Sequence, residues 1–338
     1  MSIRVYHVEL AQAQADRALA SLLGRSERSA PFERLDWLQL LASASLNAGR
    51  CFLAVASDAT RIVALPLRET AFGYEQLGDW YSFFVRPVGD GDGDLLAALA
   101  GSLRRPLRLR PMPETDARAM AQALRAQGWL GAVSACDFNY HCAITSSSFE
   151  EWWSTRPGAL RETVRRRSRD GRVAIQIASE FSAEAWSDYE AVYARSWKPA
   201  EGSPAFLRRF AQAEAQAGAL RLGIARIDGV PVAAQLWTIE GGTAWIHKLA
   251  HDEAHKARSP GTLLSHAMFA HAIDADKVRR IDFGTGGDAY KRDWMDSVRT
   301  RYVLEFHRPS DLRSWPRLTR LAVRALAKRP LVLPGATG

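Results

Sequence analysis

The chain has 338 residues, which at roughly 150 residues per domain is enough for about two domains, each with its own core. Hydrophobic residues make up 47% of the chain and charged residues 24%. This is an ordinary globular composition, and it excludes a disordered or fibrous chain. No apolar run approaches the roughly 18 residues of a membrane-spanning helix, and the polar start lacks the apolar stretch of a signal peptide. A cytoplasmic protein is expected, and three cysteines without CxxC spacing fit a reducing compartment.

The first half of the chain predicts an alternation of strands and helices. These elements are a strand at 3–8, helices near 10–24 and 32–47, strands near 51–57, 61–69 and 72–78, a helix near 93–104, a strand at 106–110, a helix at 114–127 and a strand near 137–144. The pattern indicates an α/β unit.

The second half repeats nearly the same order. Its elements are a strand at 172–178, helices at 183–198 and 203–217, strands at 219–227, 230–240 and 243–250, a helix near 260–276, a strand at 279–284, a short helix near 288–296 and a last strand of sequence TRYVLEFH. The dipeptides Asp228-Gly229 and Gly241-Gly242 favour tight hairpins between the three middle strands. We therefore predict a tandem repeat of one α/β unit, joined near Ser146–Ser148, where the periodicity breaks.

The charge is concentrated in two segments. The net charge is +8, and residues 156–172 and 311–330 each carry a net +5, so the remainder is close to neutral. Each segment is either a solvated helix face or a patch suited to phosphates, nucleic acid or an anionic membrane. The second segment has the apolar stripe of a basic amphipathic helix, which either lies on such a membrane or docks on its own domain.

The segment HKARSPGTLLSHAMFAHAI predicts an anion site at the start of a helix. A serine is a natural N-cap, a proline suits the first helical position, and the following Gly-Thr leaves backbone N–H groups accessible to an anion. The alternative is that these residues only cap the helix. The candidate anion-binding residues are Lys256, Arg258, Ser259, Pro260, Gly261 and Thr262.

The segment IDFGTGGDAYKRDWM indicates a strand that ends in a glycine turn before a short helix bearing Asp288, Tyr290 and Lys291. The glycines permit a tight turn or the close approach of a ligand, but the spacing is neither GxGxxG nor GKS. Adjacent residues of a helix point in different directions, so Tyr290 and Lys291 each need a separate partner. The alternative places the tyrosine in the core and the lysine on the surface.

No metal is expected. His247, His251 and His255 are four residues apart, as in a helical metal site, but the first of them lies in a strand-like run. The acidic run GDGDGD at 89–94 lacks the glycine and the terminal glutamate of a calcium loop and is interpreted as a turn that caps a helix.

The element order and the two segments above resemble the GNAT superfamily, and specifically the CelD-like acetyltransferases, which are relatives of the Fem-type aminoacyl transferases. The stretches PFERLDWLQLL, RPGALRETVRRRSRD and ARSWK are also similar to family segments. Members commonly have Gly-Asp-Glu before the Tyr-Lys pair, whereas Gly287 here replaces the first acid. The resemblance implies tandem GNAT-like domains with mixed central sheets flanked by helices: a non-catalytic domain at 1–148, an acyltransferase domain at 149–308 and a tail helix at 309–338.

The resemblance also implies roles for individual residues. Leu249 and Ala250 would face the pantetheine arm of an acyl-CoA, and Ser259–Thr262 would hold its pyrophosphate. Tyr290 would protonate the departing sulfur, and Lys291 would stabilise developing negative charge. The residues left open as the base are Asp288 and His247, and those assigned to the substrate are Trp197, Arg165 and Arg166.

The function expected from this resemblance is an N-acyltransferase that moves an acyl group from acetyl-CoA or another acyl-CoA to an amino group. The acceptor would be a small molecule, a sugar or a cell-surface polymer precursor, which suits polysaccharide biosynthesis. One alternative is a tRNA-dependent aminoacyl transferase, the only reading in which nucleic acid is a partner. The other is a non-catalytic module of a polysaccharide assembly. The tail helix is the candidate for peripheral contact with the inner face of the membrane.

Overall fold

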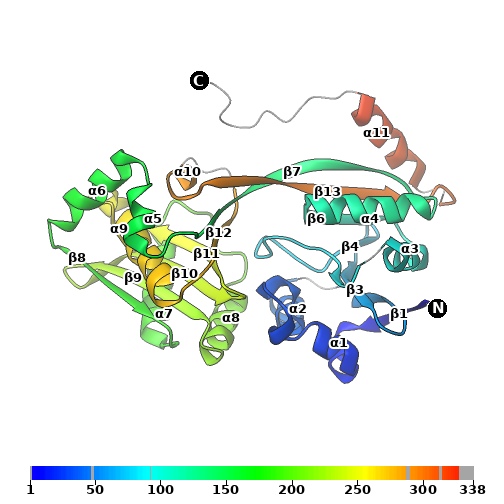
Figure 1. Cartoon of the computed structure of the whole chain (residues 1–338), viewed down its shortest axis with the longest axis horizontal. Coiled ribbons are helices and arrows are strands. Elements are labelled where there is room, and N and C mark those ends of the chain that lie inside the picture. Colours follow the sequence, from blue (N-terminus) through cyan, green and yellow to red (C-terminus); the bar gives the residue numbers. More distant parts are fainter. Residues whose placement is uncertain (1, 47–48, 92, 287–289, 312–313, 327–338) are drawn as a thin grey trace. The chain divides into compact units, whose positions relative to one another are not determined.

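The computed structural model describes residues 2–46, 49–91, 93–286, 290–311 and 314–326. It divides into two compact units (Figure 1). Unit 1 takes the chain up to Phe138 and again from Thr300, and unit 2 is Asn139–Arg299. Strands β7 (Leu130–Ala143) and β13 (Ser297–His307) contain the two boundaries. The domain ranges 1–148, 149–308 and 309–338 stay a prediction.

Unit 1 contains a mixed sheet with helices. Its strand order is β1-β2-β3-β4-β6-β13-β7, with β5 paired to β3, and the β4–β6 pair is parallel. The other strands are β1 (Arg4–Glu9), β2 (Cys51–Ser57), β3 (Ile62–Glu69), β4 (Tyr74–Gln76), β5 (Val88–Gly89) and β6 (Leu107–Pro113). The helices are α1 (Arg17–Leu22), α2 (Leu35–Ala44), α3 (Gly93–Ser102), α4 (Glu114–Ala126) and α11 (Trp315–Leu326).

Unit 2 has a mixed sheet of strand order β7-β12-β11-β10-β9-β8, in which only the β11–β12 pair is parallel. Its own strands are β8 (Val173–Ala178), β9 (Leu220–Ile227), β10 (Val230–Glu240), β11 (Thr243–His251) and β12 (Arg280–Thr285). The helices are α5 (Phe149–Ser154), α6 (Gly158–Ser168), α7 (Ala183–Ala194), α8 (Pro204–Gln216), α9 (Pro260–Ala270) and α10 (Lys291–Trp294). The predicted α/β class, with mixed sheets flanked by helices, is confirmed.

Aromatic side chains fix the helices of unit 2 that matter for the site. The ring of Phe269 on α9 stacks on Trp152 of α5 at 5.0 Å, lies 4.8 Å from Trp294 of α10 and meets Trp237 of β10 edge-on at 5.2 Å. All four side chains are buried. Since each fully buried aromatic ring contributes a few kcal/mol, this cluster holds α9 and α10 in place against the sheet.

Some elements differ from the expected ones. Strand β7 starts at Leu130 rather than near 137, because its half-exposed first residues lack the alternation by which a strand is recognised in sequence. The sequence predicts no definite element for residues 149–168, apart from the possible solvated helix face within 156–172, and these residues form α5 and α6. The helix expected at 260–276 is α9 followed by a π-helical turn at His271–Ala275.

The tail contains the predicted helix, α11. Within unit 1, the Arg317 guanidinium lies 4.5 Å over the Phe72 ring, and its Nη1 donates to the Phe72 carbonyl at 3.4 Å. These contacts tie the start of α11 to unit 1, and both docking of its apolar stripe and its contact with a membrane stay predictions. None of the helices that the structure describes combines the length and hydropathy that crossing a bilayer requires.

Candidate functional site

A cavity of about 730 Å³ opens in unit 2 at the N-terminal end of α9. Its walls contain many of the residues predicted from the sequence, together with residues that the sequence did not single out. The predicted lining residues are Trp197, Leu249, Lys256, Ser259, Pro260, Gly261, Thr262 and Tyr290. The additional ones are Leu160, His251, Glu253, Ser265, Asp293 and Trp294.

The separation of two parallel strands exposes one edge of β11 beside this cavity. The β11–β12 ladder covers only Thr243–Trp245 and Arg280–Asp282, whereas β11 continues to His251. In the part of the chain that the structure describes, β11 beyond Trp245 therefore has no ladder partner on that side. Leu249 lines the cavity and Ala250 is buried beside it. The exposed backbone N–H and C=O groups are suited to an extended ligand lying along the strand.

The start of α9 presents backbone donors to the cavity. Ser259 adopts a left-handed conformation (φ 53°, ψ 43°), and its side chain makes no capping hydrogen bond. The prediction of a side-chain N-cap is therefore wrong, because the preceding 3₁₀ turn, Glu253–Arg258, ends in a backbone reversal that Ser259 completes. Pro260 has no N–H, and the N–H groups of Gly261 and Thr262 are first-turn donors beyond the reach of intrahelical carbonyls. An anion is favoured here by these donors and by the helix dipole.

The basic side chains of this loop differ in their access to the cavity. Lys256 lines it and is exposed, with Nζ 3.6 Å from the Glu253 carboxylate, so an exposed pair of modest strength holds the ammonium nearby. Arg258 is half-buried and is not among the described lining residues. Lys256 is thus the cation best placed to neutralise a bound phosphate.

His251 is a site residue that sequence reasoning missed. Its ring lies 4.4 Å from the ring of Trp197, and its Nδ1 would be 3.3 Å from a Cβ atom placed on Gly261. Burial lowers the pKa of His251, which favours the neutral imidazole near pH 7. A neutral imidazole has one N–H, and the Glu253 carboxylate, 3.2 Å from Nε2, favours the proton on that nitrogen, which leaves Nδ1, toward Gly261, as a hydrogen-bond acceptor.

A β-bulge explains why His247 and His251 have different surroundings. Leu236 of β10 pairs with Lys248 and Trp237 pairs with Ile246, so His247 is an extra residue in β11. Such a bulge inverts the alternation of side chains that follow it. His247 therefore faces α8, where its Nε2 lies 2.8 Å from Thr238 Oγ1 and its ring 5.0 Å from Phe210, and it is not among the described residues of the cavity.

Tyr290 and Lys291 point in different directions, as expected for neighbours. Tyr290 lines the cavity, with its ring edge-on to Phe283 at 5.7 Å. The Lys291 ammonium is buried and donates to the carbonyl of Thr285 at 2.6 Å and to those of Phe283 and Gly286 at 3.5 Å. The structure thus places Lys291 as the residue that holds the turn after β12, rather than in the cavity. Asp288 and Gly287 lie outside the described residues.

We predict that Lys291→Met lowers the free energy of unfolding by at least about 2 kcal/mol, because the substitution leaves buried carbonyl groups without a donor. Urea unfolding of the full chain measures this. Lys277→Met, at an exposed position of unit 2, is the control and should change stability by less than about 0.5 kcal/mol. Equal stability of the two variants would contradict the role assigned to Lys291.

Arg165 and Arg166 lie on the exposed face of α6. Arg165 donates to both carboxylate oxygens of Glu162 at 2.7 Å, and neither arginine is among the described lining residues. The same helix contributes Leu160 to the cavity wall. The arginines therefore form a basic surface on a helix adjoining the site and do not contact its interior.

Five histidines have pKa values that burial lowers, so in each case the unfolded state takes up a proton at higher pH than the folded state. Their contribution to stability is complete above about pH 6.5 and is lost as the pH falls below it. We predict a smaller free energy of unfolding at pH 5.5 than at pH 7.5 in urea titrations, and the opposite order would contradict the burial of these rings. The histidines are His7, His141, His251, His266 and His307.

The described residues contain no group of three or more His, Cys, Asp or Glu side chains arranged to hold a metal ion. The chain has no significant match in sequence among the curated proteins. Residues 157–292 match the family model of an acetyltransferase (GNAT) domain, and this range contains every described lining residue of the cavity except Asp293 and Trp294.

Solved structures share the fold over most of the chain. The C-terminal domain of a protein described as a lysylphosphatidylglycerol synthetase, from Agrobacterium fabrum, is 11% identical with a TM-score of 0.59, covering 93% of this chain and 96% of that one. FemX is 9% identical with a TM-score of 0.56, covering 80% and 94%. A tandem GNAT protein from the clavulanic acid biosynthesis pathway is 13% identical with a TM-score of 0.53, covering 92% and 100%. At these identities the likeness concerns the fold alone.

Proposed function

We propose that this chain is an N-acyltransferase that takes its acyl group from an acyl-CoA, a proposal that the match of residues 157–292 to the acetyltransferase (GNAT) domain model supports. The observation that carries the proposal is the cavity in which the start of α9, the exposed edge of β11 and Tyr290 meet. These are the parts that a thioester carrier needs: a site for phosphates, a strand for an extended arm, and a proton donor near the end of that arm.

The phosphates of the carrier would lie at the first turn of α9. The N–H groups of Gly261 and Thr262 would donate hydrogen bonds there, and Lys256 would supply the positive charge. The indole of Trp197, which packs on His251 and is 47% exposed, offers a flat apolar surface at the same wall.

The pantetheine arm would lie along β11, where backbone groups beyond Trp245 are available on one side. A neutral amine attacks the thioester carbonyl to give a tetrahedral intermediate, whose oxyanion a β11 backbone N–H would stabilise. Collapse of the intermediate breaks the carbon–sulfur bond, and Tyr290 transfers its phenolic proton to the departing thiolate. The ammonium proton of the intermediate passes to a base, for which this chain's described residues give no unique candidate in the cavity.

The proposed acceptor is an amino group of a small molecule, a sugar or a cell-surface polymer precursor, and the proposed location is the cytoplasm. The test is to screen acetyl-CoA and longer acyl-CoAs against a panel of amines, amino sugars and amino acids, with mass detection of the acylated product. An amide product that requires both the acyl-CoA and the amine supports the proposal. Absence of binding of every acyl-CoA in calorimetry would overturn it.

A second candidate is tRNA-dependent aminoacyl transfer, which the exposed arginines of α6 beside the cavity favour. Six arginines lie on α6 or in the turn after it, and such a surface fits a phosphate backbone. This candidate predicts binding of aminoacyl-tRNA that weakens steeply between 50 and 200 mM salt. Saturable acyl-CoA binding with no tRNA binding would decide in favour of the first candidate. The arginines are Arg161, Arg165, Arg166, Arg167, Arg169 and Arg172.

A further inference from the structure

Two carboxylates line the cavity at α9, those of Glu253 and Asp293, so the lining alone does not single out one of them as a proton acceptor. Glu253 lies in the 3₁₀ turn before α9, with its oxygens 3.6 Å from Lys256 Nζ and 3.2 Å from His251 Nε2. That carboxylate is already shared between two groups at the proposed phosphate site. Asp293 is exposed, and within the described residues its carboxylate forms no hydrogen bond or ion pair.

The turn that contains α10 directs its side chains to different parts of unit 2. Lys291 reaches back to the carbonyls after β12, and Arg292 turns to β7, where its Nε lies 3.4 Å from the Tyr140 hydroxyl group. Tyr290 and Asp293 are three positions apart, and the Asp293 N–H donates to the Tyr290 carbonyl at 3.2 Å, so one helical turn joins them. Both of these side chains line the cavity. A phenol and a carboxylate thus face the same space.

The rest of unit 2 holds this turn at both ends. At its start, the buried ammonium of Lys291 donates to the carbonyls of the preceding residues. At its end, the buried guanidinium of Arg156 donates from Nη1 to the Trp294 carbonyl at 3.3 Å. Arg156 Nη2 pairs with the Asp296 carboxylate at 2.6 Å. Side chains carried by a turn fixed in this way keep their positions when a substrate binds.

The place of α10 puts Asp293 at the thioester end of the cavity. The indole of Trp294 packs on Phe269 of α9, which comes eight residues after Gly261 and therefore about 12 Å further along the helix axis. The proposed phosphate site is at Gly261, and an arm that runs back from it along β11 brings its thioester toward α10. Asp293 therefore lies where the amine meets the thioester, and Glu253 lies at the other end.

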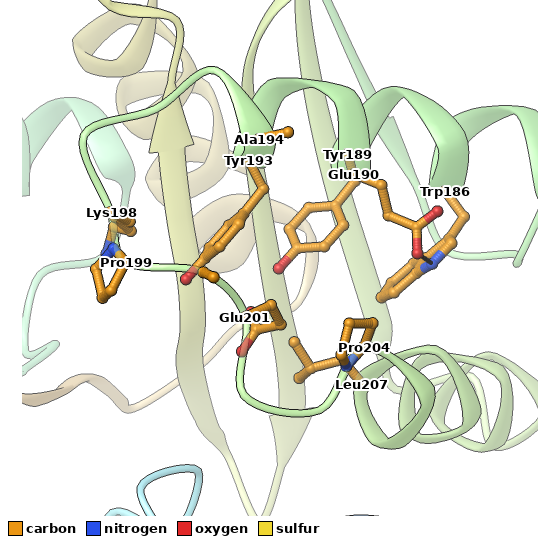
Figure 2. Close-up of a pocket in the computed structure, with 11 residues that line it drawn as sticks. Trp186, Tyr189, Glu190, Tyr193, Ala194, Lys198, Pro199, Glu201, Pro204 and Leu207 are labelled. Carbon is orange, nitrogen blue, oxygen red and sulfur yellow. Dashed lines mark hydrogen bonds between the residues drawn. The ribbon is translucent and has the colours of Figure 1, made fainter.

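The carboxylates of the other cavity of unit 2 are engaged elsewhere. That cavity, about 550 Å³ in volume, lies between α7 and α8, and its described lining shares no residue with the cavity at α9 (Figure 2). Figure 2 shows Glu190 turned toward Trp186, whose Nε1 donates to it at 2.9 Å. Glu201 is paired with Lys248 at 2.9 Å. Neither group reaches the space that Asp293 faces.

We propose that Asp293 receives the amine of the acceptor: its carboxylate binds the acceptor as an ammonium ion and later takes up a proton from the tetrahedral intermediate. This inference rests on the proposed function. A carboxylate forms a charge-assisted hydrogen bond with an ammonium ion and a weaker one with a neutral hydroxyl group. The site therefore favours amines over alcohols as acceptors.

The protons balance over one turnover. The bound ammonium loses one proton to solvent, and the neutral amine forms the carbon–nitrogen bond at the thioester carbonyl. As the carbon–sulfur bond breaks, the phenolic proton of Tyr290 passes to the sulfur and a proton of the nitrogen passes to the Asp293 carboxylate. The Asp293 carboxyl group then returns this proton to the Tyr290 phenolate, directly or through water. The products are the amide, the free thiol and one proton released to solvent.

Steady-state kinetics of the full chain with Asp293→Asn and Asp293→Glu test this assignment. The probe is the amine that gives most product in the acyl-CoA screen, and its neutral counterpart is the alcohol of the same skeleton, such as glucose for glucosamine. We expect Asp293→Asn to raise KM for the amine and to lower kcat, each by about tenfold or more, and to leave KM for the acyl-CoA within about threefold. Asp293→Glu, which keeps the charge, should restore part of both.

Calorimetry in the presence of CoA, where no acyl transfer occurs, measures the preference for an ammonium ion. The unaltered chain should bind the amine about tenfold or more tightly than the alcohol, and Asp293→Asn should bind the two alike. A merely structural role of Asp293 would leave this preference intact. Asp90→Asn, at an exposed position of unit 1, is the matched control and should change neither the kinetics nor the preference.

Unchanged kinetics in Asp293→Asn, or equal binding of amine and alcohol by the unaltered chain, would overturn the proposal. A rise of KM for the amine in Glu253→Gln but not in Asp293→Asn would overturn it too, because the amine would then lie at the other carboxylate. In each of these cases the product still forms, and the proposed function stands. Absence of product with every amine of the screen would remove the proposed function, and this inference with it.

Discussion

Gly261→Val is expected to weaken acetyl-CoA binding at least tenfold, a loss of about 1.4 kcal/mol or more, with little change in the stability of the fold. The reason is local: a Cβ atom at Gly261 would lie 3.3 Å from His251 Nδ1, and the branched valine side chain would cover the first-turn N–H groups. Calorimetry with acetyl-CoA measures the loss. Since Gly261 has no left-handed φ, valine adds no backbone strain there.

Gly93→Val is the matched control for this experiment. Gly93 is the first residue of α3 in unit 1, and a Cβ atom there would meet nothing within 4 Å. Acetyl-CoA binding should be the same in this variant as in the unaltered chain. Undiminished binding in Gly261→Val would show that the phosphates are held elsewhere.

Tyr290→Phe is expected to lower kcat about a hundredfold and to leave KM for the acyl-CoA within about threefold, because a general acid contributes roughly 10² to 10⁴ to the rate. The ring stays beside Phe283 in this variant and only the proton donor is lost. Steady-state kinetics with the amine found in the acyl-CoA screen measure both constants. A thioester of a more acidic thiol should restore part of the rate of Tyr290→Phe, because its thiolate is a better leaving group and departs without being protonated.

Tyr6→Phe in unit 1, where the hydroxyl group donates to Asp16 at 3.4 Å, is the control and should leave kcat unchanged. If Tyr290→Phe lowers kcat by the same factor for thioesters of acidic and of ordinary thiols, the tyrosine supports the shape of the site and is not the proton donor. If Tyr290→Phe raises KM for the acyl-CoA and leaves kcat unchanged, the tyrosine contributes to binding of the carrier and not to the chemical step.

The parts of the site that depend on local pattern were predictable from the sequence. The hairpins at Asp228-Gly229 and Gly241-Gly242 and the Ser-Pro-Gly helix start are short-range signals, and they placed β9, β10, β11 and α9 within a few residues. Once β11 and α9 are placed, the loop between them brings Lys256 and Gly261 to the cavity. The role of Tyr290 was implied by the resemblance to the GNAT superfamily and not by a local pattern, and the structure places this residue in the cavity wall.

The residues that were missed depend on features that no local pattern carries. The bulge at His247 follows from pairing with β10, and it decides that His251 rather than His247 lies at the cavity. The burial of the Lys291 ammonium depends on the path of the carbonyls from Phe283 to Gly286. The ion pair between Glu201 and Lys248 joins residues 47 positions apart, so it could not be predicted from a local sequence pattern.

The most direct measurement is a crystal structure of the full chain with bound acetyl-CoA. We predict that the pyrophosphate accepts hydrogen bonds from the N–H groups of Gly261 and Thr262, that the pantetheine arm runs along β11 beyond Trp245, and that the sulfur lies within hydrogen-bond distance of the Tyr290 hydroxyl group. A carrier bound away from the start of α9, or a sulfur atom remote from Tyr290, would contradict this prediction.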